Sequence, residues 1–150
     1  TGLARSSLYN SFGSKSALFE QALQRYVDRQ IEGLQRTFEG RDLQSALLQL
    51  FERIARDNDG GKGCLLINSV HSQHHARDIS ADALRQGFAR MAGQLGRLAA
   101  DRDALQRSAG ELAADIITAI AGLRTLQKTG LPRAQVLGAA RRSAKRIAAG

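Results

Sequence analysis

The apolar residues of this chain recur every three to four positions along most of its length. One such run lies between residues 18 and 34, and Gly40 follows it, so the pattern predicts a long amphipathic helix from residue 15 to about residue 35. The same period predicts a second helix over residues 43–54. Helical spacing is therefore the dominant signal in the first third of the chain.

Loop and capping residues predict the next elements. The glycine-rich segment at residues 58–63 predicts a flexible loop, and residues 64–71 form a short apolar stretch of about two helical turns. Ser80 can then cap another helix. Its apolar residues alternate at spacings of four and three, as in a packed seam: Leu84, Phe88, Met91, Leu95 and Leu98.

Two helices are predicted at the end of the chain. The segment "SAGE" at residues 108–111 fits a capping box and starts a helix to Lys128, with Gly130 as its stop. Pro132 suits the first position of a final helix that reaches about Ile147. Because neither a strand pair nor a repeat interrupts this order, the predicted fold class is all-α.

Charge alone does not identify a partner. The 150 residues carry a formal charge of +8, and residues 108–150 hold seven Lys or Arg against two Asp or Glu. A solvated helix face explains this excess as well as DNA does. The one cysteine excludes an internal disulfide, and no apolar run approaches the ~20 residues that span a bilayer. We therefore expect a cytoplasmic protein without a membrane partner.

The opening stretch "TGLARSSLYNSFGSKSALF" reads as the second half of a helix-turn-helix. Gly2 allows a sharp turn, and Leu3 and Leu8 can face a small core. A short helix is predicted over residues 5–11, and Ser14 can cap the long helix that follows.

This stretch resembles the recognition helix of the tetracycline-repressor-like (TetR) family of bacterial transcriptional regulators. The matching residues are Gly2, Leu8, Tyr9, Phe12, Ser14, Lys15, Leu18 and Phe19. The segment "GKGCLLINS" at residues 61–69 is also similar to one found in a large subset of the family. Two positions depart from the pattern: Ala4 replaces the usual capping Ser or Thr, and Ser16 replaces a frequent acidic residue.

The resemblance implies two parts in an all-α, TetR-like fold. Residues 1–36 would be the end of a helix-turn-helix domain with its linking helix, and residues 37–150 an effector-binding and dimerisation domain. The family's first helix and most of its second would be missing from the chain, so we expect a truncated or unobserved N-terminus.

Six residues are candidates for DNA contact. Lys15 would place a cation in the first turn of a helix, which is unfavourable unless an anion such as a DNA phosphate binds there. Hydroxyls can reach phosphates, whereas short polar or guanidinium side chains can meet base edges. The candidates are Arg5, Ser6, Tyr9, Asn10, Ser11 and Lys15.

A regulator of this kind needs an effector pocket and a second subunit. The predicted pocket walls are mainly apolar, with two polar side chains among them: Leu50, Phe51, Ile54, Ile67, Asn68, His71, Phe88, Met91, Leu95 and Ile120. Second apolar stripes on the last two helices predict a homodimer interface. Its residues are Ala113, Ile117, Ala121, Val136, Leu137, Ala140, Ala144 and Ile147.

The sequence gives little indication of a catalytic site, a cofactor or a metal site. The sequence contains no P-loop, and no local Ser-His-acid arrangement. His71, His74 and His75 have helical spacing near Cys64, but a polar connection explains them more simply than a metal site. Cys64 is either a sensor of oxidants or electrophiles or a small packed residue, and packing is the simpler interpretation.

The predicted function is a sequence-specific DNA-binding transcriptional regulator. We expect a ligand-responsive repressor that binds a palindromic DNA operator as a homodimer and responds to a small-molecule effector. The alternative is an all-α protein-interaction or small-molecule carrier domain without DNA binding, and an enzyme ranks third.

Overall fold

The computed structural model describes residues 15–56 and 81–150. These residues form the helices α2 (Lys15–Phe38), α3 (Leu43–Arg56), α5 (Ala81–Ala100), α6 (Ala109–Lys128) and α7 (Arg133–Ala149). No strand occurs in these two ranges, and the predicted all-α fold class is confirmed. The predicted helix at 5–11, the loop at 58–63, the apolar stretch at 64–71 and the Ser80 cap lie outside the described residues.

The capping box predicted at "SAGE" is present at the start of α6. Ser108 Oγ accepts a hydrogen bond from the Glu111 backbone N at 3.2 Å, and the Ser108 backbone N donates to the Glu111 carboxylate at 2.9 Å. The helix ends at Lys128 as predicted, and Gly130 follows it with a φ of +74°. Pro132 stands one position earlier than predicted, as the N-cap residue of α7.

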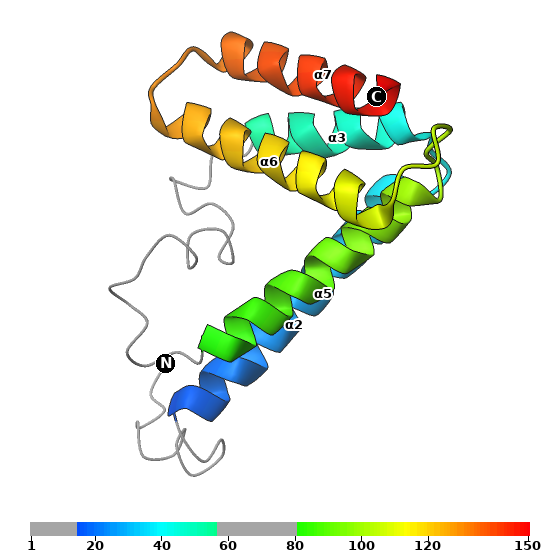
Figure 1. The fold of residues 1–150 in the computed structure, drawn as a ribbon. Coiled ribbons are helices and arrows are strands. Elements are labelled where there is room, and N and C mark those ends of the chain that lie inside the picture. The colour runs from blue at the N-terminus through cyan, green and yellow to red at the C-terminus, as the bar shows by residue number, and fades with distance from the viewer. Residues whose placement is uncertain (1–14, 57–80) are drawn as a thin grey trace.

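The helices form two groups (Figure 1). Helices α2 and α5 lie side by side and run in the same direction, as the contacts between Asp28 and Arg90 and between Phe38 and Arg102 show. Helices α3, α6 and α7 form a second group at the far end of this pair. Gln127 Nε2 donates to the Ile54 carbonyl at 2.7 Å, and Arg141 Nε donates to Glu52 at 2.7 Å. Helix α6 therefore runs parallel to α3, and α7 returns antiparallel to both.

Two clusters of apolar side chains hold these helices together. The main core joins the end of α2 to α3, α6, α7 and the second half of α5, and its largest fully buried side chains are Phe38, Leu47, Phe51, Leu95, Leu112 and Ile116. The arm cluster joins the first halves of α2 and α5. Its buried residues are Leu23 and Val27, with Phe19, Tyr26, Ile31, Ala83, Leu84, Phe88 and Met91 packed against them. Met91 contacts both clusters.

An ion pair in the turn between α5 and α6 links this turn to the end of α7. Asp103 is 8% exposed, and its carboxylate accepts hydrogen bonds from Arg107 Nη2 at 2.7 Å and Nε at 3.0 Å. Arg107 Nη2 also donates to the Ile147 carbonyl near the end of α7, at 2.7 Å. These Arg107 hydrogen bonds lower the pKa of Asp103 to about 2.

The Asp103 pKa makes the fold sensitive to acid. Because the folded pKa of about 2 lies below the ordinary aspartate pKa of 3.8, the pair stabilises the folded state above pH 4, and this contribution is lost as pH falls towards 2. We expect Asp103→Asn to lower stability at pH 7 and to flatten its pH dependence between pH 4 and 2, measured by urea unfolding. An unchanged slope would contradict this assignment.

Helix α5 crosses the start of α6 at a glycine. A Cβ built on Gly96 would lie 2.2 Å from the Ala109 carbonyl oxygen and 3.2 Å from the Ala113 Cβ. Contact with a backbone atom cannot be relieved by a side-chain rotation, so this crossing requires glycine.

We expect Gly96→Ala to destabilise the protein by about 1–3 kcal/mol, because the two helices must separate. The matched control is Gly110→Ala, an exposed helical glycine whose added Cβ would meet only Ser108 Oγ, at 3.9 Å. Thermal unfolding of both variants provides the measurement, and equal melting temperatures would contradict the close crossing.

Candidate functional site

The predicted DNA contacts lie at and beyond the beginning of α2. Lys15 is the first residue of this helix, and the first turn contains no acidic residue. The partial positive charge of that turn is therefore not neutralised by a carboxylate of its own, which favours an anion such as phosphate there. Arg5, Ser6, Tyr9, Asn10 and Ser11 lie outside the described residues, and their roles stay predictions.

Helix α5 supports the half of α2 that leads to these residues. Leu23 and Val27 are 2% and 0% exposed and pack with Ala83, Leu84 and Phe88 of α5. On the outside of this contact, Arg90 Nη2 donates to the Asp28 carboxylate at 2.8 Å. We call this pair of half-helices, residues 15–32 and 81–92, the arm.

The other half of α2 is fixed in the main core. Phe38 is fully buried, and the Arg102 guanidinium lies 5.6 Å from the centre of its ring. Arg102 Nε also donates to the Arg41 carbonyl at 3.1 Å. In turn, Arg41 Nη1 donates to the carbonyls of Arg36, Thr37 and Glu39, so it caps the C-terminal end of α2. Helix α2 thus has one end in the main core and the other in the arm.

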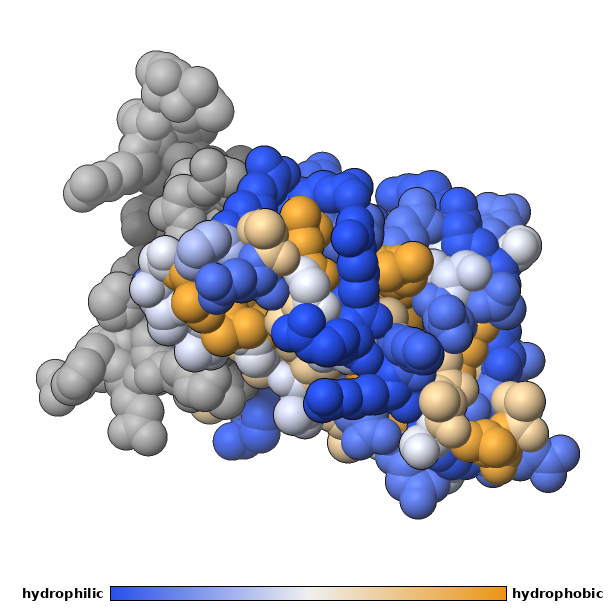
Figure 2. Space-filling model, turned by 90° about the horizontal axis from the view of Figure 1, so that it is seen from above, coloured by the Kyte–Doolittle hydropathy of each residue, from blue (hydrophilic) through white to orange (hydrophobic). Residues whose placement is uncertain are grey.

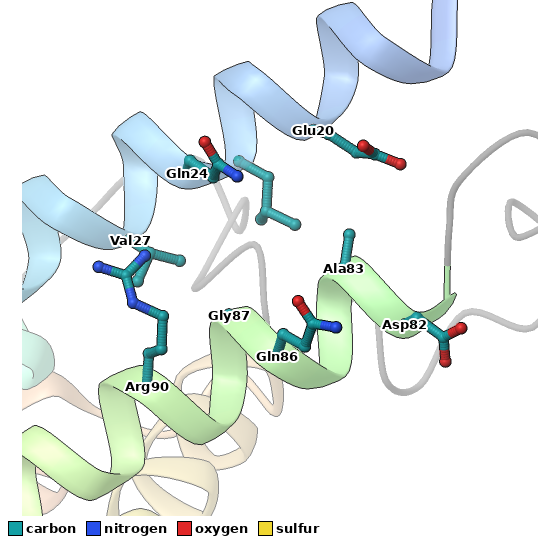
Figure 3. Close-up of a pocket in the computed structure, with 9 residues that line it drawn as sticks. Glu20, Gln24, Val27, Asp82, Ala83, Gln86, Gly87 and Arg90 are labelled. Carbon is teal, nitrogen blue, oxygen red and sulfur yellow. The ribbon is translucent and has the colours of Figure 1, made fainter.

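A groove of about 220 Å³ runs between α2 and α5 in the arm (Figure 3). Val27 and Ala83 point into the space between the two helices, whereas Arg90 reaches from α5 towards α2. The remaining lining residues add apolar and polar groups: Glu20, Leu23, Gln24, Asp82, Gln86 and Gly87. Sequence reasoning missed this groove, because nothing in the period of either helix indicates which other helix it will face.

The predicted effector-pocket residues are divided between the two clusters. Leu50, Phe51, Ile54 and Leu95 are buried in the main core, and Ile120 packs beside them. Phe88 belongs to the arm cluster, and Met91 contacts both. Ile67, Asn68 and His71 lie outside the described residues. None of the seven described residues of this set lines the groove in the arm, and the role of all ten as pocket walls stays a prediction.

The predicted dimer residues fall into two sets. Ala113 is buried at 8% exposure, and Val136, Ala140 and Ala144 are buried in this chain's own main core, where α7 packs on α3 and α6. Ile117, Ala121, Leu137 and Ile147 are half-buried. The stripe of α7 assigned to a second subunit is therefore largely used within the chain. Seen from the side of α7, apolar residues are exposed only in separate patches among hydrophilic ones (Figure 2).

Part of the basic excess near the end of the chain is paired internally. The Glu52 carboxylate binds Arg56 at 2.6 Å and Arg141 at 2.7 Å, and the hydrogen bond from Arg141 holds the pKa of Glu52 below its ordinary value. Helix α7 also lies at the opposite end of the molecule from the beginning of α2 (Figure 1). These observations favour a solvated helix face for the α7 cations.

Neither a metal-ligand cluster nor a membrane-spanning helix occurs in the described residues. Residues 15–56 and 81–150 contain no group of three His, Cys, Asp or Glu side chains arranged to hold a metal ion. Nor does any helix in these ranges combine the length and apolar character that crossing a bilayer requires. The cluster of His71, His74 and His75 with Cys64 lies outside them.

Comparison with known proteins identifies one informative relative. The chain is 33% identical over 84 residues to the HTH-type transcriptional repressor BdcR of Escherichia coli (strain K12). The match covers 53% of this chain and 43% of that protein, so the chain spans less than half the length of its relative. No protein-family model and no solved structure matches it. The similarity supports a helix-turn-helix, DNA-binding transcriptional regulator.

Proposed function

We propose that this chain is part of a TetR-like transcriptional repressor that binds a palindromic operator as a homodimer and responds to a small-molecule effector. The observation that carries the proposal is the agreement between two signals in the sequence. The opening segment has the residues of a recognition helix, and the chain is similar to an HTH-type transcriptional repressor. Neither signal indicates an enzyme, and we propose no catalytic role.

The arrangement of α2 is suited to this function. Its first residue, Lys15, follows directly on the predicted recognition segment, and its last turn is buried among α3, α5 and the turn after α5. A change in the packing of the main core can therefore be transmitted along one helix to the DNA-contacting residues. The effector must bind the two arrangements with different affinities for this to occur.

Operator binding provides the direct test. With the full gene product and its own upstream DNA, we expect sequence-specific retention in a gel shift. Lys15→Ala and Tyr9→Phe should weaken it with little change in melting temperature, and Lys15→Ala should reduce the salt dependence by about one ion. The control is Lys145→Ala, which removes an exposed cation from α7.

Two outcomes would contradict the proposal. Unchanged affinity in both the Lys15 and Tyr9 variants would reject the phosphate contacts. If the parent shows no specific retention even at low salt, an all-α interaction or carrier domain becomes the better interpretation.

We propose that the second subunit docks on the outer faces of α6 and α7. We expect Ile117→Arg to give monomers in light scattering and to abolish tight operator binding, because the second half-site contact is lost. Ile117 also contacts the main core, so Ala121→Arg, outside that cluster, provides a second variant. Gln44→Arg, on an exposed position of α3, is the control. If both α6 variants still dimerise, the interface lies elsewhere.

A further inference from the structure

Helices α2 and α5 each pass from the arm cluster into the main core, and each has a glycine at the passage. In α2, Ile31 belongs to the arm cluster and Leu34 to the main core, with Gly33 between them. In α5, Gly93 lies between Met91, which contacts both clusters, and Leu95 of the main core. Each helix therefore leaves the arm cluster and enters the main core beside a glycine.

The two glycines lie at nearly the same level of the helix pair. Asp28 faces Arg90 across the arm, Gly33 comes five residues after Asp28, and Gly93 comes three residues after Arg90. Because the helices are parallel and rise ~1.5 Å per residue, the glycines are offset along the axis by only about 3 Å.

Neither glycine is required by close packing. A Cβ on Gly33 would meet nothing within 4 Å, and one on Gly93 would meet only the tip of Arg97, at 4.0 Å. Gly96, one turn further along α5, is the contrast, because its Cβ would collide with a backbone oxygen. Neither Gly33 nor Gly93 is among the positive-φ glycines of the described residues. Both helices thus contain a poor helix former where no contact demands it.

A buried hydroxyl connects Gly33 to α3. Thr37 is 3% exposed, and its Oγ1 donates to the Gly33 carbonyl at 2.7 Å. A hydroxyl bond to the carbonyl four residues earlier often bends a helix. The same Oγ1 accepts a hydrogen bond from Arg53 Nη1 of α3, at 3.3 Å. The position of α3 is thereby linked to the Gly33 carbonyl of α2.

We propose that α2 and α5 bend together at Gly33 and Gly93, so that the arm moves as one unit against the main core, and that Arg53 sets the bend through Thr37. Leu23, Val27 and the Asp28–Arg90 ion pair keep the two half-helices together during this movement. For a DNA-binding protein the bend moves the recognition segment, a consequence that rests on the proposed function. The hinge itself does not depend on it.

Distances between pairs of spin labels test the hinge without DNA or effector. In a Cys64→Ser background, one pair at Gln30 and Gln49 spans the hinge, and a second pair at Arg25 and Arg85 lies within the arm; all four positions are exposed. Dilution with unlabelled protein restricts the signal to distances within one chain. We expect a broad distribution across the hinge and a narrow one within the arm.

Alanine at the hinge should narrow only the first distribution. We expect Gly33→Ala and Gly93→Ala each to reduce its width and to raise the melting temperature by about 2–4 °C, because alanine favours the helix. Gly110→Ala, in an exposed turn of α6, is the matched control and should leave both distributions unchanged. A parent distribution already as narrow as that of the variants would overturn the hinge. Equal breadth within the arm would also overturn it, because the arm would then fray and not bend.

The role of Arg53 and Thr37 has its own test. Thr37→Val removes the hydroxyl at similar volume and should shift the mean distance across the hinge, whereas Thr37→Ser keeps the hydroxyl and should not. An unchanged mean distance across the hinge in Thr37→Val would overturn the proposal that Arg53 of α3 sets the bend. Because these measurements contain no DNA, failure of the hinge and failure of operator binding are distinguishable.

Discussion

Burial of the last turn of α2 is the interaction on which the rest of the structure depends. Phe38 is fully buried, and the side chains around it come from α2, α3 and the turn that follows α5. Arg102 lies against its ring and donates to the Arg41 carbonyl, while Arg41 caps the end of the same helix. Because the ends of α2 and α5 meet here and the arm cluster joins their first halves, the two helices run side by side.

The layer formed by α3, α6 and α7 closes over that junction. Gly96 lets α5 cross directly against the start of α6, and the Asp103–Arg107 pair then holds the connecting turn to the end of α7 through the Ile147 carbonyl. The groove in the arm lies outside this layer, between helices that share a much smaller apolar contact. The described residues thus form one large core and one smaller apolar cluster in the arm.

Features with a local cause were predictable from the sequence, and features with a distant partner were not. The capping box at Ser108 and Glu111 depends on residues three apart, so its pattern was sufficient. The ion pair between Glu52 and Arg141 joins residues 89 apart, and no local pattern indicates it. The stripe of Val136, Ala140 and Ala144 fits either a second subunit or α3, and in the structure it packs within the chain. Most predicted DNA contacts lie outside the described residues and stay predictions.

The two clusters of the described residues differ in how many apolar side chains they bury. Complete burial of a large apolar side chain contributes about 1.5–3 kcal/mol, and among the described residues the arm cluster buries Leu23 and Val27 completely. Surface ion pairs such as Asp28–Arg90, each half exposed, add at most about 1 kcal/mol. Separating helices in the main core would expose many such side chains at once, including Phe38, Phe51 and Leu112. The proposed bend at Gly33 and Gly93 keeps both clusters packed, so it exposes far less apolar surface than separating the helices of the main core would.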